Sequence, residues 1–480
     1  MLYSANLPSL KKAPSLLQGL FLWLPHAYIL ILAIFISQGA LIANIDTYNA
    51  QRVVQLSIFG VTLAVFPTLT YIFKVDLRLV FALPKRLIIM VAISVFAIFF
   101  GALVSTLHAK MPVWALLDFG YWVICLGALW YLVISFRQFT PMRWYYFGVL
   151  IVLLMAMFSL RSFIDIVLFT PFSNRIVATP GFANIRLYSD LAVVFMPLSL
   201  LVFTRARSPK LIAAFYVFNI YWGWVLLITE ARSGILSIGV ALLWVACVHG
   251  QQGRLILIRC FVTFLSSIFL FVCFPVLSAG RQVRDMTSSS GRFHLWEVSW
   301  DQFVDSFPFG VGGMMFAARG AVEPASPHNM IMLLLAEWGA LCFFGLLVVG
   351  VVVFGRRVVP SQQSSPKSID VHVVVVLSAI ASSVNLLFAG AHIAPFSSIG
   401  LLLAYGALLA IYLPAPESGP GSSTYANAIS IFLLLMFGVV SILGFELYHL
   451  TETLRQECGA FSEYLHPRFW VQGLLECGYH

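Results

Sequence analysis

Long apolar runs follow one another along most of the chain, and short polar segments separate them. A helix that crosses a lipid bilayer needs about 20 mostly apolar residues. Thirteen runs approach or exceed that length, at residues 27–45, 53–73, 87–107, 113–135, 145–168, 187–204, 211–229, 233–249, 257–278, 329–354, 371–390, 397–413 and 428–447. The run at 397–413 is short, and the run at 428–447 follows a linker rich in Pro, Gly and Ser. The pattern therefore predicts 12 transmembrane helices, or 13 if every run crosses.

The composition supports this prediction. The chain is 61% hydrophobic and 10% charged, with a mean hydropathy of +0.95, whereas soluble domains are about 45–50% apolar and about 25% charged. We expect an all-α polytopic membrane protein in which residues 1–480 form a single integral membrane domain. A polar tail follows at residues 448–480, where Cys458 and Cys477 could pair in an oxidising compartment. The net charge of +9 reflects membrane topology and not nucleic-acid binding.

Lys and Arg residues in every second loop predict the orientation, because cytoplasmic loops carry an excess of these residues. With the N-terminus inside, the inside segments hold Lys11, Lys12, Lys74, Arg78, Lys85, Arg86, Arg137, Arg143, Arg205, Arg207, Lys210, Arg254, Arg259, Arg356, Arg357 and Lys367. We therefore expect a multi-pass protein of the bacterial inner (cytoplasmic) membrane with a cytoplasmic N-terminus. The long polar segment at residues 279–327 then lies outside, in the periplasm of a Gram-negative cell, where neither ATP nor nucleotide sugars are present.

The 279–327 segment predicts a large periplasmic loop with short amphipathic helices. Aromatic residues at helical spacing within 292–306 predict a helix that lies on the membrane surface, with Asp301 and Asp305 on its solvated face. The sequence Pro308-Phe309-Gly310-Val311-Gly312-Gly313 follows. Its glycines permit a close backbone approach or a positive φ. A turn between two short helices and a phosphate-binding nest are both compatible with this pattern.

Outside segments should be poor in Arg, yet the predicted outside segments contain many. These are Arg161, Arg175, Arg186, Arg232, Arg281, Arg284, Arg292 and Arg319. A guanidinium presents a planar fork of donors that fits pairs of phosphate oxygens. The set predicts a pocket for a strongly anionic lipid headgroup such as a pyrophosphate. The alternative is that each Arg reaches toward lipid headgroups or caps a helix end.

A candidate base lies in Pro327-His328-Asn329, immediately before an apolar run. Either His328 or Asn329 could cap the following helix. A histidine at a helix N-terminus near several arginines should stay neutral, and a neutral imidazole can take a proton from a sugar hydroxyl. The alternative is a capping or interfacial histidine. His294, close to Arg292, and His392, in a short outside turn, are candidates for the lining of the same site.

The segment Glu230-Ala231-Arg232-Ser233-Gly234 places two charges between two spans. Its last residues open a helix, whose unpaired N–H groups would favour an anion beside Arg232. The alternative is a Glu–Arg pair that closes a tight turn. Because the sequence has no Asp-x-Asp pair, no Walker loop and no His/Cys cluster with ligand spacing, we expect no metal and no cofactor. Arginines would then neutralise a leaving group.

Taken together, the segment from Glu230 to about Gly345 resembles the O-antigen ligase / polymerase family of membrane glycosyltransferases. The matching pieces, in order, are Ala231-Arg232-Ser233-Gly234, Ser290-Gly291-Arg292 with Trp296, Pro308-Phe309-Gly310-Val311-Gly312, His328-Asn329 and Glu337-Trp338-Gly339. Each piece alone is weak, but their order and spacing are specific. The His-Asn pair and the long loop best resemble the lipopolysaccharide O-antigen ligases. The fold of this family resembles that of the all-helical, lipid-using glycosyltransferases.

The resemblance implies a donor and an acceptor, namely an undecaprenyl-pyrophosphate-linked glycan and lipid A–core. It implies His328 as the catalytic base, with Arg232 and Arg292 on the donor pyrophosphate. The remaining candidate substrate-binding residues are Arg161, Arg175, Arg186, Arg281, Arg284, His294, Arg319 and Asn329. The reaction would be metal-independent and would invert the anomeric centre. A thirteenth run departs from the twelve spans expected for the family and leaves the side of the C-terminus open.

Two kinds of alternative function remain open. An O-antigen polymerase or a protein O-oligosaccharyltransferase would use the same donor with a different acceptor. A transporter of an anionic lipid or solute belongs to another class, and Arg161, Asp165, Asp190 and Glu337 in or beside spans would suit its relay. An alternating-access site should lie near the membrane midplane between repeats, whereas the polar residues here concentrate toward one face.

Overall fold

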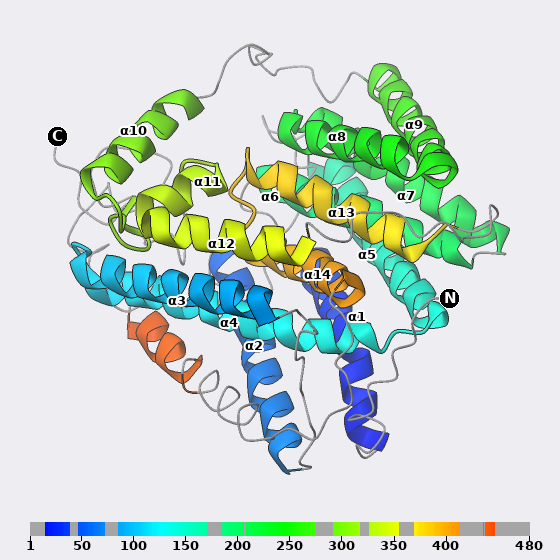
Figure 1. The fold of residues 1–480 in the computed structure, drawn as a ribbon. Helices are drawn as coiled ribbons and strands as arrows, with labels where there is room; N and C mark the ends of the chain where they lie inside the picture. The colour runs from blue at the N-terminus through cyan, green and yellow to red at the C-terminus, as the bar shows by residue number, and fades with distance from the viewer. Residues whose placement is uncertain are drawn as a thin grey trace.

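The computed structural model describes the backbone of most of the apolar part of the chain. The described residues are 15–38, 47–72, 85–169, 185–205, 208–274, 291–316, 326–354, 369–412, 435 and 437–446. Every regular element within these ranges is helical, as the all-α prediction requires (Figure 1).

Fourteen α-helices are labelled along this part of the chain. They are α1 (Ser15–Gln38), α2 (Thr47–Ile72), α3 (Lys85–His108), α4 (Pro112–Arg137), α5 (Pro141–Phe169), α6 (Ile185–Ser199), α7 (Pro209–Ile228), α8 (Arg232–Val248), α9 (Gly250–Cys273), α10 (Arg292–Asp305), α11 (Met330–Leu333), α12 (Gly339–Phe354), α13 (Val371–Leu386) and α14 (Pro395–Tyr412). A 3-10 helix, η3 (Leu200–Thr204), extends α6, and a π-helical turn, η6 (Leu334–Trp338), separates α11 from α12.

The helices have the length and composition of membrane spans. Eight apolar helices in the described ranges are long enough to cross a bilayer, at Ile89–His108, Pro112–Arg137, Pro141–Leu168, Leu187–Thr204, Pro209–Ile228, Gly250–Cys273, Met330–Val352 and Pro395–Tyr412. Shorter apolar helices are Leu22–Phe35, Ala50–Val65, Arg232–Val248, Val371–Leu386 and Phe437–Glu446. The chain is therefore a polytopic membrane protein.

The helices differ from the hydropathy prediction in three places. The first helix begins at Ser15 and runs through Pro25, so the predicted start at residue 27 was too late. Helices α8 and α9 are separated only by His249, where hydropathy predicted a longer polar gap. The apolar run at 329–354 is not one continuous α-helix, because η6 interrupts it.

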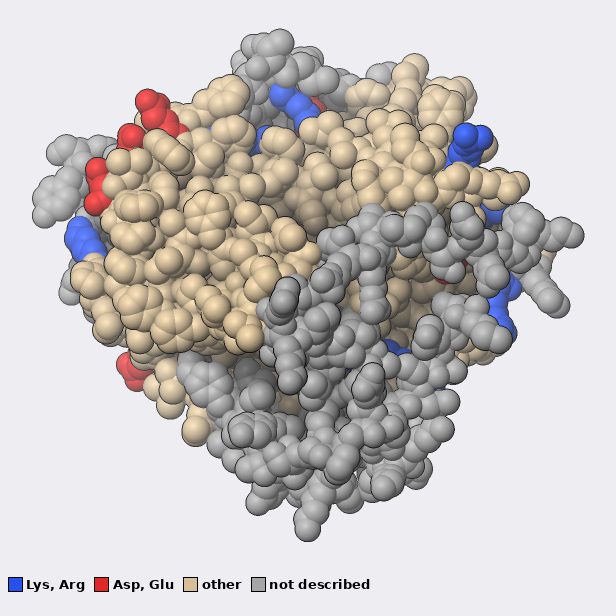
Figure 2. Space-filling model, in the orientation of Figure 1, with Lys and Arg blue, Asp and Glu red and all other residues tan. Residues whose placement is uncertain are grey.

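The interior and the periphery of the bundle differ in exposure. Neighbouring pairs include α3 with α12, α8 with α13, α4 with α14 and α1 with α5 (Figure 1). Large apolar side chains remain exposed on the outer helices, for example Phe96 on α3 and Phe269 on α9. Figure 2 shows an extended surface with few charged side chains over α3 and α12. Such a surface suits lipid contact and would be a liability in water.

Several connections meet at one end of the bundle, which we call the His328 end. The α2 start meets the α13–α14 turn, because the Tyr48 hydroxyl donates to the Ile393 carbonyl oxygen at 3.1 Å. The α6 start meets the α13 end, because Asn385 Nδ2 donates to Asp190 Oδ1 at 2.8 Å. A Cβ on Gly234, at the start of α8, would lie 3.4 Å from Ser189 on α6.

Helix α10 also lies at the His328 end, and the helix predicted there is confirmed. Its bounds, Arg292–Asp305, agree with the predicted range of 292–306. Asp301 and Asp305 are exposed, as expected for a solvated face. Figure 2 shows acidic side chains at the edge where α10 lies in Figure 1.

Candidate active site

Two of the quoted motifs pack directly against each other, backbone to backbone. The Val311 amide donates to the Ala336 carbonyl oxygen at 2.8 Å, and the Gly312 amide donates to the Glu337 carbonyl oxygen at 2.9 Å. The Ala340 amide donates to the Pro308 carbonyl oxygen at 2.8 Å. The segments 308–313 and 336–340 therefore form one unit, which we call the motif junction.

Glycines make this junction possible. Gly310 has φ +80°, and a Cβ there would lie 2.6 Å from the backbone carbon and oxygen of Glu337. Gly339 has φ +75°, and a Cβ there would overlap the Pro308 carbonyl oxygen. The close-approach interpretation of the glycine-rich motif is confirmed. Because the Val311 and Gly312 amides already donate to protein carbonyls, a phosphate nest built on them is excluded.

Glu337 braces the junction from inside. Its side chain is fully buried, and its Oε1 atom accepts a hydrogen bond of 3.2 Å from the Phe316 amide. Its carbonyl oxygen also accepts a hydrogen bond of 2.6 Å from Ser105 Oγ on α3. The carboxylate thus holds the end of the 308–316 segment against the α12 region.

His328 lies in a constrained turn immediately before α11. Its φ is +51°, a left-handed conformation that few residues other than glycine adopt. Its amide donates to Ser326 Oγ at 3.3 Å. Asn329 is the helix cap, since its Oδ1 atom accepts from the Ile331 amide at 2.9 Å and from the Met332 amide at 3.2 Å. Of the two capping candidates, Asn329 has that role, and His328 stands just outside the helix.

Helix α10 is fixed onto residues 326–329, which precede α11 and which we call the His328 turn. Trp296 Nε1 donates a hydrogen bond of 3.1 Å to the carbonyl oxygen of Pro327. Leu295 on α10 also packs with Phe316 and Leu333 in a buried cluster, against which Ile393 of the α13–α14 turn packs. Helix α10 is thereby joined to the His328 turn, to Phe316 at the end of the 308–316 segment and to Leu333 of α11.

The α13–α14 turn lies beside the imidazole of His328. A Cβ on Gly390 would be 3.5 Å from His328 Nδ1. His392 in the same turn is buried, and its ring stacks on Trp122 of α4 with centroids 5.9 Å apart. His392 thus belongs to the turn that borders His328, and its place in the lining of the site stays a prediction.

Two of the candidate arginines begin helices. Arg232 is the first residue of α8, half-buried, and its amide donates to the Glu230 carbonyl oxygen at 2.8 Å. Glu230 itself has φ +52°, so a tight turn precedes the helix. Arg292 is the first residue of α10, also half-buried, and follows Gly291 at φ +76°. Both side chains accompany helix N-termini, where partial positive charge adds to theirs.

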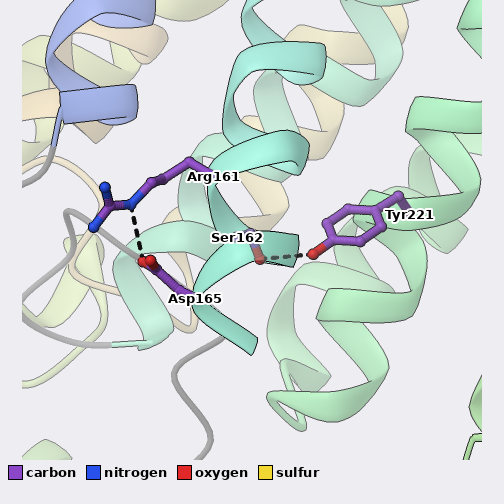
Figure 3. Close-up of polar contacts among 4 residues, drawn as sticks. All are labelled: Arg161, Ser162, Asp165 and Tyr221. Carbon is purple, nitrogen blue, oxygen red and sulfur yellow. Dashed lines mark hydrogen bonds and ion pairs between the residues drawn. The ribbon is translucent and has the colours of Figure 1, made fainter. Parts of the chain in front are cut away.

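Arg161 forms an ion pair on α5 (Figure 3). Its Nε atom donates to Asp165 Oδ2 at 3.1 Å, and its side chain is 40% exposed whereas that of Asp165 is 4% exposed. At the next residue of α5, Ser162, the Oγ atom accepts a hydrogen bond of 2.9 Å from the Tyr221 hydroxyl on α7. Asp165 therefore orients the Arg161 guanidinium through one edge.

The remaining site candidates are described in part. His294 is exposed, with its Nδ1 atom 3.9 Å from Glu297 Oε2. Arg186 belongs to the first turn of α6, but its side chain lies outside the described residues. Arg175, Arg281, Arg284 and Arg319 also lie outside the described residues, as do Cys458 and Cys477. Within the described ranges, no group of three His, Cys, Asp or Glu side chains is arranged to hold a metal ion.

Sequence reasoning missed Arg52 on α2. Its Nη2 atom donates to the Ile393 carbonyl oxygen at 2.5 Å and to the Tyr48 hydroxyl at 3.2 Å, and its Nη1 atom donates to Gln55 Oε1 at 2.6 Å. It stands just before the apolar run at 53–73, so hydropathy places it in a loop. The available signal was the spacing of Tyr48, Arg52 and Gln55, which puts all three on one helix face.

Residues 217–349 match the family model described as O-antigen ligase. The chain contains an O-antigen ligase domain. The matched range runs from α7 to α12 and includes Arg232, Arg292 and His328. The protein is thus an enzyme of the glycosyltransferase type, and the family of the matched model implies lipid-linked glycan substrates. A comparison with curated proteins gives no match.

Proposed function

We propose that this O-antigen ligase-family protein transfers O-antigen polysaccharide from undecaprenyl pyrophosphate to a sugar of lipid A–core. The reaction takes place at the periplasmic face of the inner membrane. The observation that carries the proposal is the position of His328 within the matched domain, where α10 and the α13–α14 turn both contact its turn.

The proposed topology follows the sequence prediction. Residues 1–480 form a single membrane domain with a cytoplasmic N-terminus, and the shorter apolar helices also cross, giving 12 spans, or 13 with the helix at Phe437–Glu446. The segment 279–327 is the periplasmic loop, with α10 on the membrane surface, and residues 448–480 form a polar tail. In this topology the basic loops are cytoplasmic, as the positive-inside rule requires, and the loop that leads to His328 is on the other side.

His328 acts as the general base. In its neutral form, an imidazole can accept a proton from a sugar hydroxyl at pH 7. Its backbone is confined by the left-handed φ and by Asn329, which caps α11. Pre-organisation of this kind is what a base needs in order to remain within hydrogen-bond reach of the attacking hydroxyl.

The transfer is a single displacement. The acceptor hydroxyl oxygen forms a bond to C1 of the donor sugar while the bond from C1 to the pyrophosphate oxygen breaks. The hydroxyl proton passes to His328, and the bonding electron pair leaves with undecaprenyl pyrophosphate. Because the attack comes from the face opposite the leaving group, the anomeric centre is inverted.

Arginines stabilise the departing pyrophosphate. Arg232 and Arg292 each add a full charge to a helix N-terminus, a combination that favours phosphate. Arg161, held at its Nε edge by Asp165, presents its terminal nitrogens to the same headgroup. Arg175, Arg186, Arg281, Arg284, His294 and Arg319 complete the proposed surroundings. The Oδ1 atom of Asn329 is used in the cap, so this residue would contact substrate through Nδ2.

Metal independence is part of the proposal, with guanidinium groups in the role of a cation. Activity should therefore persist in EDTA. A loss of activity that Mg²⁺ restores would overturn this part.

The interactions of the buried acids weigh against a proton-relay transporter. Asp165 pairs with Arg161, Asp190 accepts from Asn385, and Glu337 accepts from the Phe316 amide. A liposome flux assay tests the transporter directly.

A choice of acceptors tests the enzyme. Purified protein should be given undecaprenyl-pyrophosphate-linked glycan with one of three acceptors: lipid A–core, repeat-unit lipid or a pilin-like protein. Product on lipid A–core alone supports a ligase, whereas product on either of the others points to a polymerase or to a protein O-oligosaccharyltransferase.

A further inference from the structure

The turn between α13 and α14, at residues 387–394, is tied to α2 by two donors on one acceptor. The Tyr48 hydroxyl donates to the Ile393 carbonyl oxygen at 3.1 Å, and Arg52 Nη2 donates to the same oxygen at 2.5 Å. We call residues 387–394 the Gly390 turn. Since α2 and this turn are more than three hundred residues apart in sequence, the contact is one that only the tertiary fold creates.

Arg52 is held in a buried polar network. Its side chain is 1% exposed, and its guanidinium lies 4.9 Å from the Tyr121 ring centroid and 5.7 Å from that of Tyr48. Gln55, which accepts from Arg52 Nη1, donates in turn to the Tyr121 hydroxyl at 2.9 Å and to Ser398 Oγ. The network therefore joins α2 to α4 and to the first turn of α14.

A buried guanidinium is an expensive way to fill space inside a membrane protein. Ionisable residues within spans are rare and mark function by default. Well-packed apolar side chains in place of buried charges are often neutral for stability or stabilising. What an apolar residue cannot do is donate to the Ile393 carbonyl oxygen, so the value of Arg52 lies in holding that oxygen.

The Gly390 turn borders the proposed base. A Cβ on Gly390 would be 3.5 Å from His328 Nδ1 and 3.7 Å from the Ile393 side chain. Ile393 also packs against the cluster of Leu295, Phe316 and Leu333, which joins α10 to α11. A shift of the Ile393 backbone would therefore move both the wall beside the imidazole and the cluster under α10.

We propose that Arg52 is a positioning residue for His328, acting from α2 through the Ile393 carbonyl oxygen and the Gly390 turn. This inference rests on the proposed function, in which His328 is the base. Arg52 itself touches no substrate. Misplacement of a catalytic group by about 1 Å can lower a rate by about 100-fold, so Arg52→Gln should lower kcat by about 10- to 100-fold.

The pattern of kinetic constants separates positioning from binding. The proposed pyrophosphate arginines are on other elements, so KM for donor and acceptor should change by less than about threefold in Arg52→Gln. Tyr48→Phe should have a smaller effect of the same kind, because Arg52 still donates to Ile393. The matched control is Tyr28→Phe, which also removes one buried hydroxyl but from a bond to Thr62 Oγ1 that joins α1 to α2.

Two readouts do not require activity. The Ile393 and Ala394 amides donate to the Gly390 carbonyl oxygen at 3.0 and 3.4 Å, so hydrogen–deuterium exchange there reports whether the turn is held. The rate at which diethyl pyrocarbonate acylates His328, followed by mass spectrometry, reports the surroundings of the imidazole. Both rates should rise in Arg52→Gln, rise less in Tyr48→Phe and stay unchanged in Tyr28→Phe.

The outcomes decide as follows. Unchanged exchange and acylation in Arg52→Gln would overturn the proposal, as would a rise in both with kcat unchanged. If Arg52→Gln does not fold, Tyr48→Phe alone decides by the same criteria. If the wild-type protein transfers no glycan, the proposed function fails, but acylation still judges the link: a faster reaction of His328 in Arg52→Gln supports it, and an unchanged rate overturns it.

Discussion

The indole Nε1 of Trp296 donates a hydrogen bond of 3.1 Å to the carbonyl oxygen of Pro327, the residue that precedes His328. Helix α10 therefore has a structural role at the candidate active site. It holds the backbone that carries the proposed base. Leu295 of α10 also packs with Phe316 and Leu333 in a buried cluster, which holds the helix in the same place.

Trp296→Phe tests this contact, because it keeps an aromatic ring and removes the donor. We expect the free energy of unfolding to fall by about 0.5–1.5 kcal/mol, the usual net value of one hydrogen bond, and kcat for ligation to fall with it. Trp300→Phe is the control, since Trp300 lies on the same helix and is 50% exposed. Equal ligation rates in the two variants would show that the bond does not matter for the site.

Gly339→Ala tests the motif junction. Gly339 has φ 75° and ψ −176°, a region that only glycine adopts readily, and a Cβ there would overlap Pro308. We expect a loss of at least about 1–3 kcal/mol of stability, measured by thermal unfolding in detergent. Gly350→Ala on α12 is the control: nothing lies within 4 Å of its added Cβ, and alanine should stabilise that helix slightly. Similar unfolding temperatures for the two variants would contradict the close packing.

Glu337 separates a bracing role from a proton relay. Glu337→Gln keeps an acceptor for the Phe316 amide and should retain most ligation activity. Glu337→Ala leaves that amide buried without its acceptor, which costs about 1–3 kcal/mol. The measurement is unfolding together with ligation rate for both variants. Complete loss of activity in Glu337→Gln with normal stability would instead indicate that the titrating carboxylate takes part in function.

Arg232→Lys tests the pyrophosphate clamp. Lysine keeps the charge but loses the planar fork that contacts two phosphate oxygens, so ligation should fall by about tenfold or more, as expected when a charged hydrogen bond is lost. Arg254→Lys is the control, because that exposed residue lies near the start of α9, which follows the end of α8 that is distant from Arg232. A fully active Arg232→Lys enzyme would mean that charge alone suffices.

The sequence was sufficient to predict the helices and to nominate candidate site residues. Apolar length identifies spans because the bilayer imposes it, and the aromatic spacing at 292–306 identified α10. It could not pair the Pro308–Gly312 motif with Glu337-Trp338-Gly339, because backbone hydrogen bonds between distant segments leave no periodic signal. The glycines at 310 and 339 hinted at close approach but not at the partner.

Arg52 shows the same limit from another side. Hydropathy treats an arginine beside an apolar run as a loop residue, since burial of its charge depends on acceptors elsewhere in the chain. Those acceptors include the Ile393 carbonyl oxygen, a backbone atom whose position depends on the α13–α14 turn. No rule of composition or spacing identifies an acceptor in so distant a part of the chain.

The most direct test of the account is the ligation rate of purified His328→Ala with defined donor and lipid A–core. The matched control is His108→Ala, which removes an exposed histidine at the end of α3. We predict that His328→Ala lowers kcat by about 10²–10⁴-fold, as for loss of a general base, while donor binding and His108→Ala remain near normal. A His328→Ala enzyme that ligates at close to the wild-type rate would contradict the assignment of His328 as the base.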